Sequence, residues 1–186
     1  QGGDSTPPSL TVNVYNNTLW NNKTAIGVDN ALSGKNPSVT IKNNIIANDG
    51  DGTGMTKSGT VTVNNSYNNF YNNGTNFGGG TSAGTGDISL NPLFVSTTSG
   101  SENFRLQSTS PSIDVGTTLT DVTTDILGST RPYGTAYDQG AYENDNRVPI
   151  ISSQSPTSGA TNVAQDANIS FRLTDADSGI NTSSIT

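Results

Sequence analysis

Three stretches of the chain repeat one pattern, and this repetition limits the fold more than any other feature. Each stretch opens with alternating apolar and polar residues and continues through an Asn-rich corner, a short apolar run and a second Asn-rich turn. The stretches cover residues 12–22, 39–49 and 61–73, so they start 27 and then 22 residues apart. Alternation with a period of two is typical of half-buried strands. Self-similarity at about 20 to 50 residues indicates a solenoid.

A parallel β-helix is the solenoid that fits this pattern best. Each repeat would form one coil, and stacked coils bury a continuous narrow core. Only alternate strand residues face inward, which accounts for a hydrophobic share of only 30%. The Asn runs are interpreted as turns and as ladders of side chains between coils, in preference to a ligand site.

Charge and residue content exclude several classes of function. The net charge is −7, which disfavours nucleic acids and anionic membranes as partners because both need basic patches. The chain has no Cys and no His, which removes thiolate metal sites, His-ligated zinc and the Ser-His-Asp triad. No apolar run reaches about 18 residues, so we expect no membrane insertion. The opening Gln1-Gly2-Gly3-Asp4 suggests a piece of a longer protein.

An ordered series of short motifs follows the repeats. It reads Asn91-Pro92-Leu93-Phe94, Phe104-Arg105-Leu106, Ser110-Pro111-Ser112-Ile113-Asp114, Asp125-Ile126-Leu127-Gly128, Arg131-Pro132 and Asp138-Gln139-Gly140-Ala141-Tyr142-Glu143. With the repeats, this series resembles the C-terminal end of secreted right-handed parallel β-helix proteins of the pectate-lyase-like or choice-of-anchor type. The resemblance covers residues 10–143. Asn91 and Gln139 depart from the family pattern, which has Asp and an apolar residue there.

The resemblance implies a fold and says little about activity, because related chains include polysaccharide lyases, hydrolases and surface proteins without known chemistry. The motifs themselves have a structural explanation. Asp114, Asp125 and Asp138 precede turns, where a carboxylate can accept backbone N–H bonds. Arg131 could pair with one of them and lock a cap near Glu143 over the last coil.

A second unit is expected from residue 148 onward, which gives domains 1–147 and 148–186. Its Ser155-Pro156 and Gly159-to-Val163 segments, followed by an alternating strand at 168–173, resemble the opening of bacterial immunoglobulin-like repeats. Such sandwiches need about 100 residues, so this one is incomplete. The chain was cut, or it represents part of a longer one, or another chain supplies the missing strands by self-association.

Calcium is the cofactor that the sequence suggests, at the junction between the two units. Asp145 and Asn146 lie in an acidic linker, and Asp175 and Asp177 follow one strand pair later. This resembles the cadherin arrangement, in which a linker and the next domain share Ca²⁺. Hard oxygen ligands suit Ca²⁺, which takes about six to eight of them. The alternative is a polar linker and an ordinary turn.

Catalytic residues are harder to find. The resemblance implies that a lyase coil would carry Ca²⁺-binding carboxylates and a Lys or Arg base. Lys42 is expected to point outward without a neighbouring acid, so we interpret it as solvated. Asp49 and Asp51 lie in a Gly-rich stretch, which predicts a mobile turn or weak cation binding. Whether the chain is an enzyme stays open, although no convincing acid–base pair favours it.

The sequence therefore favours a structural segment of a secreted or cell-surface protein of a prokaryote: a stalk, an adhesin segment or a subunit of a fibre. One alternative is the non-catalytic end of a polysaccharide lyase or hydrolase. Another is a carbohydrate-binding β-helix, in which aromatic residues grip a polysaccharide. Aromatic residues occupy comparable positions in their coils, namely Trp20, Tyr67, Phe70 and Tyr71. On the outside they could grip sugar rings, and on the inside they would fill the core. We prefer the second interpretation.

Overall fold

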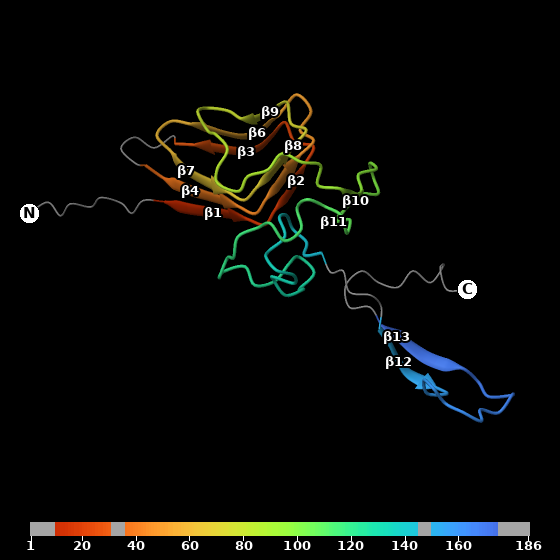
Figure 1. Ribbon diagram of the computed structural model, residues 1–186. Coiled ribbons are helices and arrows are strands. Elements are labelled where there is room, and N and C mark those ends of the chain that lie inside the picture. The colour runs from red at the N-terminus through yellow and green to blue at the C-terminus, as the bar shows by residue number, and fades with distance from the viewer. Residues whose placement is uncertain (1–9, 31–35, 145–149, 175–186) are drawn as a thin grey trace, which may run out of the picture. The chain divides into compact units, whose positions relative to one another are not determined.

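The computed structural model describes residues 10–30, 36–144 and 150–174, and every regular element in these ranges is a β-strand (Figure 1). The predicted all-β class is therefore confirmed. The chain divides into two compact units, residues 1–144 and 145–186. The predicted boundary at residue 147 lies outside the described residues.

Three coils of three strands each form the body of the first unit (Figure 1). The strands are β1 (Thr11–Tyr15), β2 (Thr18–Trp20) and β3 (Thr24–Asp29), β4 (Ser38–Lys42), β5 (Ile45–Ala47) and β6 (Thr53–Ser58), and β7 (Thr62–Ser66), β8 (Asn69–Tyr71) and β9 (Thr75–Phe77). They build three sheets in the orders β1-β4-β7, β2-β5-β8 and β3-β6-β9. Every pairing in these sheets is parallel, which is the arrangement of a parallel β-helix.

The register corrects one detail of the sequence pattern. Val12 pairs with Val39, and Val39 pairs with Val63, whereas the pattern started the third repeat at Val61. The second interval is therefore 24 residues and not 22. A shift of two residues leaves the same side chains facing inward, because strand side chains alternate with a period of two. The third sheet was not anticipated from the sequence at all.

The inward faces of the sheets form the main core. Leu19, Ile46 and Phe70 lie in register on β2, β5 and β8. Phe70 and Ile46 are almost completely buried. The cluster around them comprises Ile26, Val39, Ile41, Met55 and Val61. In the described part of the chain this cluster contains seven buried residues, which agrees with the low apolar share of the sequence.

The outer face of the middle sheet is covered as well. Trp20, Ala47 and Tyr71 form a row in register on that face. An antiparallel pair, β10 (Phe94–Ser96) and β11 (Asn103–Leu106), packs over it. Phe94 meets Trp20 edge to face, with ring centroids 5.6 Å apart. The middle sheet is thus sandwiched between two apolar clusters, which explains the complete burial of Ile45 and Ala47.

A ladder of amide side chains holds the first corner of each coil. The backbone N–H and the Nδ2 group of Asn17 both donate to Oδ1 of Asn44, at 2.9 and 3.0 Å. Asn44 donates in the same way to Asn68, at 3.0 and 2.9 Å. Asn68 then donates to Oδ1 of Asp87, at 2.8 and 3.1 Å. Two rungs also bond the backbone of the preceding coil, since Nδ2 of Asn44 donates to the carbonyl of Val14 and Nδ2 of Asn68 donates to the carbonyl of Ile41.

The residue before each rung turns the chain through a left-handed conformation. Asn16, Asn43 and Tyr67 have φ values of 51°, 56° and 57°. Asn tolerates this conformation better than most residues. The Asn-Asn pairs of the sequence therefore divide the work, one residue making the bend and the next making the rung. This confirms the prediction of turns and corner ladders.

A second ladder at the next corner contains an acid. The N–H of Asn22 donates to Oδ1 of Asp49 at 2.8 Å, and the N–H of Asp49 donates to Oδ1 of Asn73 at 3.2 Å. Asp49 is 5% exposed, so the prediction of a mobile turn was wrong for this residue. Its Oδ2 atom is buried without a partner among the described residues. Burial raises the pKa of Asp49 above the ordinary 3.8, although hydrogen bonds from Asn22 oppose the shift.

The third coil ends in a cap. Residues 78–90 run along its exposed edge, where the N–H of Ile88 donates to the carbonyl of Asn68 and the N–H of Phe70 donates to the carbonyl of Ile88. Asp87 closes the first ladder from the same segment. This side of the stack therefore presents an irregular loop to solvent and not a free strand edge, which would invite pairing with other chains.

The second unit contains one antiparallel hairpin in its described part, formed by β12 (Ile150–Ser155) and β13 (Ser170–Thr174). Ile151 pairs with Leu173, and Phe171 lies two residues away on the same face. Ile151 and Phe171 are 52% and 51% exposed. The hairpin agrees with the start of a β-sandwich, and a two-stranded hairpin alone is marginally stable at best.

Asn44→Ala tests the first ladder. The variant removes the acceptor of the Asn17 N–H and Nδ2 groups, and it removes the Nδ2 donor from the partly buried carbonyl of Val14. We expect the free energy of unfolding to fall by about 2 to 4 kcal/mol, measured by urea denaturation followed by circular dichroism. Asn13→Ala, at an exposed position of β1, should change it by less than about 0.5 kcal/mol. Equal effects of both variants would contradict a structural role for the ladder.

Asp49→Asn tests the second ladder and its pH dependence. Because the folded pKa of Asp49 is raised, its ionisation costs the folded state more than the unfolded state. Full stability is present below about pH 3.8 and is lost as the pH rises through the folded pKa. An amide can fill the same place without charge, so we expect the variant to be more stable at pH 7 by about 1 to 3 kcal/mol. The gain should vanish near pH 3, and a gain that is the same at both pH values would refute this explanation.

Candidate functional site

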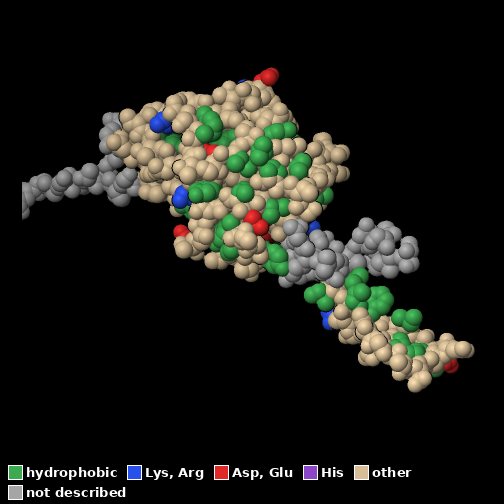
Figure 2. Space-filling view, in the orientation of Figure 1, with side chains coloured by type: hydrophobic (Ala, Val, Ile, Leu, Met, Phe, Trp, Pro, Cys, Tyr) green, Lys and Arg blue, Asp and Glu red, His purple; other side chains and the backbone are tan. Residues whose placement is uncertain are grey.

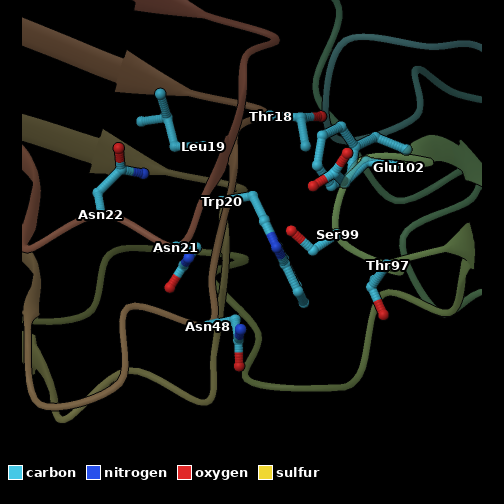
Figure 3. A pocket seen from close by; sticks show the side chains of 10 residues that line it. Thr18, Leu19, Trp20, Asn21, Asn22, Asn48, Thr97, Ser99 and Glu102 are labelled. Carbon is cyan, nitrogen blue, oxygen red and sulfur yellow. The ribbon is translucent and has the colours of Figure 1, made fainter.

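A groove opens beside Trp20, between the end of β2 and the loop that joins β10 to β11 (Figure 3). Its volume is about 570 Å³. We call it the Trp20 groove. Its lining consists of Thr18, Leu19, Trp20, Asn21, Asn22, Asn48, Thr97, Ser99, Glu102 and Phe104. Pockets for small molecules commonly measure about 300 to 1,000 Å³, so the size is suitable for a ligand.

Polar side chains face the aromatic wall of this groove. In Figure 3 the Trp20 ring lies between Asn48 on one side and Ser99 and Thr97 on the other. Glu102 is exposed, and it is the one charged residue in the lining. Phe104 also lines the groove, and its ring packs against that of Trp20 at a centroid distance of 5.9 Å. The groove thus combines an aromatic surface with hydroxyl, amide and carboxylate groups.

The aromatic residues of the coils divide between two environments. Phe70 fills the core and is 1% exposed, as predicted. Trp20 and Tyr71 lie on the outer face of the middle sheet, where they are partly exposed and pack against the second apolar cluster and not inside the coils. A second cavity of about 220 Å³ lies between them, lined also by Leu93, Phe94 and Gln107. Trp20 borders both cavities.

Buried charges lie in the segment 110–144, which we call the clamp. Nη1 of Arg131 is 2.6 Å from Oε1 of Glu143, and both side chains are about 1% exposed. Arg131 also donates to the carbonyl of Gly140 at 2.9 Å. The partner of Arg131 is therefore Glu143 and not one of the three aspartates proposed from the sequence. This buried ion pair is the contact that would lock the segment near Glu143.

All three aspartates accept backbone N–H bonds, but only Asp125 accepts them from the turn that follows it, whereas Asp114 and Asp138 each accept one from a segment more than 20 residues away. Asp114 accepts from Ala136, and Asp125 accepts from Leu127 and Ser129. Asp138 accepts from Asp114 at 2.8 Å and is 2% exposed. Burial raises the pKa of Asp138 to about 7, with smaller contributions from the charges of Glu143 and Asp114, while backbone hydrogen bonds oppose the shift.

The clamp crosses all three coils. The N–H of Ala141 donates to Oγ1 of Thr18 in the first coil. The N–H of Gly140 donates to the carbonyl of Asn43 in the second, and Nε2 of Gln139 donates to the carbonyl of Tyr67 in the third. Gly140 has φ of 93°, and a Cβ there would lie 2.8 Å from Ile45. The acids and amides of the clamp hold its backbone in place against the coils, and none of them lines the Trp20 groove.

The predicted calcium ligands cannot be placed. Asp145, Asn146, Asp175 and Asp177 all lie outside the described residues, so the calcium site stays a prediction. Within the described ranges, no group of three or more acidic residues is arranged to hold a metal ion. Lys42 lies in register between Tyr15 and Ser66, so its row contains no acid. In the same described part, no helix has the length and apolar character needed to cross a bilayer.

Sequence reasoning missed the polar side of the groove. Thr97, Ser99 and Glu102 belong to a loop that carries none of the motifs considered above. Their meeting with Trp20 depends on how the β10–β11 pair folds back over the middle sheet. The one available signal was Trp20 itself, a large aromatic residue where the next coil has Ala47.

Comparison with known proteins adds no relative. No family model matches the chain, and neither does any curated protein or solved structure. The family resemblance of the motifs therefore rests on the residues alone, and the parallel β-helix architecture rests on the strand pairings.

Proposed function

We propose that the chain is a stiff, non-catalytic segment of a secreted or cell-surface protein of a prokaryote, such as a stalk or an adhesin segment. The observation that carries this proposal is the clamp, which hydrogen-bonds to all three coils. A solenoid normally has contacts only between neighbouring repeats, so it can fray one coil at a time. A segment that bridges the first coil to the third makes the unit resist such stepwise opening.

The use of the buried charges supports the same proposal. Arg131, Asp138 and Glu143 are 4%, 2% and 8% exposed. Arg131 pairs with Glu143, and the carboxylates of Asp138 and Glu143 accept backbone N–H groups of the clamp. Shifted, buried acids often mark an active site, but here Glu143 is paired with Arg131, and neither Asp138 nor Glu143 lines the Trp20 groove. Figure 2 shows few charged side chains on the viewed face of the first unit, which suits a spacer more than a catalyst.

The first coil supports an extended stalk. Val12 is 39% exposed, although Val39, its partner in register in the second coil, is 4% exposed. Among the described residues, β1 pairs with a strand on one side only. A further coil paired with β1 would bury Val12, as the first coil buries Val39, and would continue the stack.

Antibody labelling of intact cells that produce the protein tests the location. We expect labelling without permeabilisation, and its loss after treatment of the cells with an external protease. The purified chain should release no reducing ends and no unsaturated products from a panel of neutral and acidic polysaccharides. Labelling only after lysis would refute the surface location. Sugar release would instead favour the polysaccharide lyase or hydrolase alternative.

Self-association through the second unit belongs to the same proposal. Ile169 and Phe171 are 82% and 51% exposed on the hairpin, and strands from another copy would cover them. Light scattering of the full chain should therefore give a mass above the monomer's 19.2 kDa. Phe171→Ser should restore the monomer, whereas Ile126→Ser, at an exposed apolar residue of the clamp, should not.

Calcium at the junction is tested in the same experiment. If Asp145, Asn146, Asp175 and Asp177 bind Ca²⁺, chelation should shift the assembly and restoring Ca²⁺ should reverse the shift. A wild-type chain that is monomeric with and without Ca²⁺ would argue against both ideas.

A further inference from the structure

We propose that the Trp20 groove binds a neutral saccharide. This inference is independent of the stalk proposal, because a passive spacer needs no such groove. It rests on four features of the described residues: an aromatic surface, a ring of uncharged hydrogen-bonding groups, one carboxylate, and a rigid backbone beneath them.

The aromatic surface suits a sugar ring. One face of a pyranose carries C–H groups, and these pack against an aromatic face whose π-system is electron-rich. Trp20 is held in place by Phe94 and Phe104, at centroid distances of 5.6 and 5.9 Å. Its remaining surface is partly exposed toward the groove. The ring is therefore ordered before any ligand arrives, which lowers the entropic cost of binding.

The groups around Trp20 match the hydroxyls of a sugar. Thr97 and Ser99 offer hydroxyls that donate and accept, and Glu102 offers an acceptor. Oδ1 of Asn48 accepts a 2.8 Å hydrogen bond from Nδ2 of Asn72. Nδ2 of Asn48 has no acceptor among the described residues. Asn21 is exposed at the rim. Directional polar groups beside an apolar wall are the usual source of specificity in small-molecule sites.

Charge decides which class of saccharide fits. The lining contains Glu102 and no Lys or Arg, and the chain carries a net charge of −7. A uronic acid polymer would bring carboxylates toward Glu102 without a compensating cation. A neutral sugar can donate a hydroxyl to that carboxylate, which is stronger than a bond between neutral groups. The groove therefore favours neutral over acidic glycans.

The position of the groove also favours binding. Asn21 and Asn48 occupy left-handed corners with φ of 58° and 60°. Their N–H groups donate to the carbonyls of Ala47 and Tyr71 at 3.1 and 2.9 Å. One wall thus belongs to the ladder-bound coils, which fix the polar groups relative to Trp20. The other wall is formed by the exposed loop at residues 97–102.

Fluorescence gives a direct test because Trp20 is the only tryptophan of the chain. The full chain is titrated with neutral hexasaccharides of glucose, mannose and xylose at up to millimolar concentration, and with hexagalacturonate as the acidic probe. We expect a saturable change of Trp20 emission, and protection from quenching by acrylamide, with at least one neutral probe. The acidic probe should give neither effect.

Variants locate the site. Glu102→Gln should weaken binding of the neutral probe about tenfold by calorimetry, as expected for one hydrogen bond to a charged group. Ser99→Ala should weaken it about threefold. Asp121→Asn removes the same charge at an exposed residue outside the lining and should leave the affinity unchanged. These residues are exposed, so the variants should fold, which circular dichroism checks.

Three outcomes would overturn the inference. The first is the absence of a Trp20 response to every neutral probe. The second is equal or tighter binding of hexagalacturonate, which would refute the neutral class. The third is binding that Glu102→Gln and Ser99→Ala leave unchanged, which would place the saccharide elsewhere.

Discussion

The hydrogen bond from one corner asparagine to the next is the interaction on which the rest of the structure depends. A coil must bend sharply between strands, and each bend leaves a backbone N–H that its own coil cannot satisfy. The side chain of the next Asn accepts that N–H and the neighbouring Nδ2 together, as in the step from Asn17 to Asn44. Buried polar groups cost free energy unless they are bonded. The ladders therefore support a stack whose main apolar cluster contains seven buried residues in the described part of the chain.

Fixed corners also determine what the outer surface can do. Because β2, β5 and β8 are held in register, small and large side chains alternate along one row, with Ala47 between Trp20 and Tyr71. Phe94 packs into the same cluster and brings the β10–β11 pair with it. The clamp covers the rest of that face and ends in the buried pair of Arg131 and Glu143. A pair of this kind adds little stability over apolar residues but is costly to break, which suits a lock.

The sequence was sufficient for the architecture and insufficient for the surface. Alternation and Asn-rich corners at a regular spacing predict stacked parallel strands, and the pairings confirm them. The third sheet escaped notice because β9 has three residues and β3 and β6 contain Gly and Thr, which weakens their alternation. Glu143 was missed as the partner of Arg131 because Asp125 and Asp138 are closer to Arg131 in the sequence. The groove was missed because Asn22 and Glu102 are brought together by folding and not by any local motif.

Two aspartates show how position in a ladder decides the effect of a charge. Asp87 stands at the end, where Oδ1 accepts from the N–H and the Nδ2 of Asn68, and Oδ2 accepts from Asn65 and Gly84. Both of its oxygens are satisfied, and a group that only accepts is suited to terminate a chain of donors. Asp49 stands inside the second ladder, where an amide would donate inward, as Nδ2 of Asn73 does to Ile46. One of its oxygens is left without a partner in the described structure. The same chemical group therefore closes the first ladder at Asp87 and weakens the second ladder at Asp49.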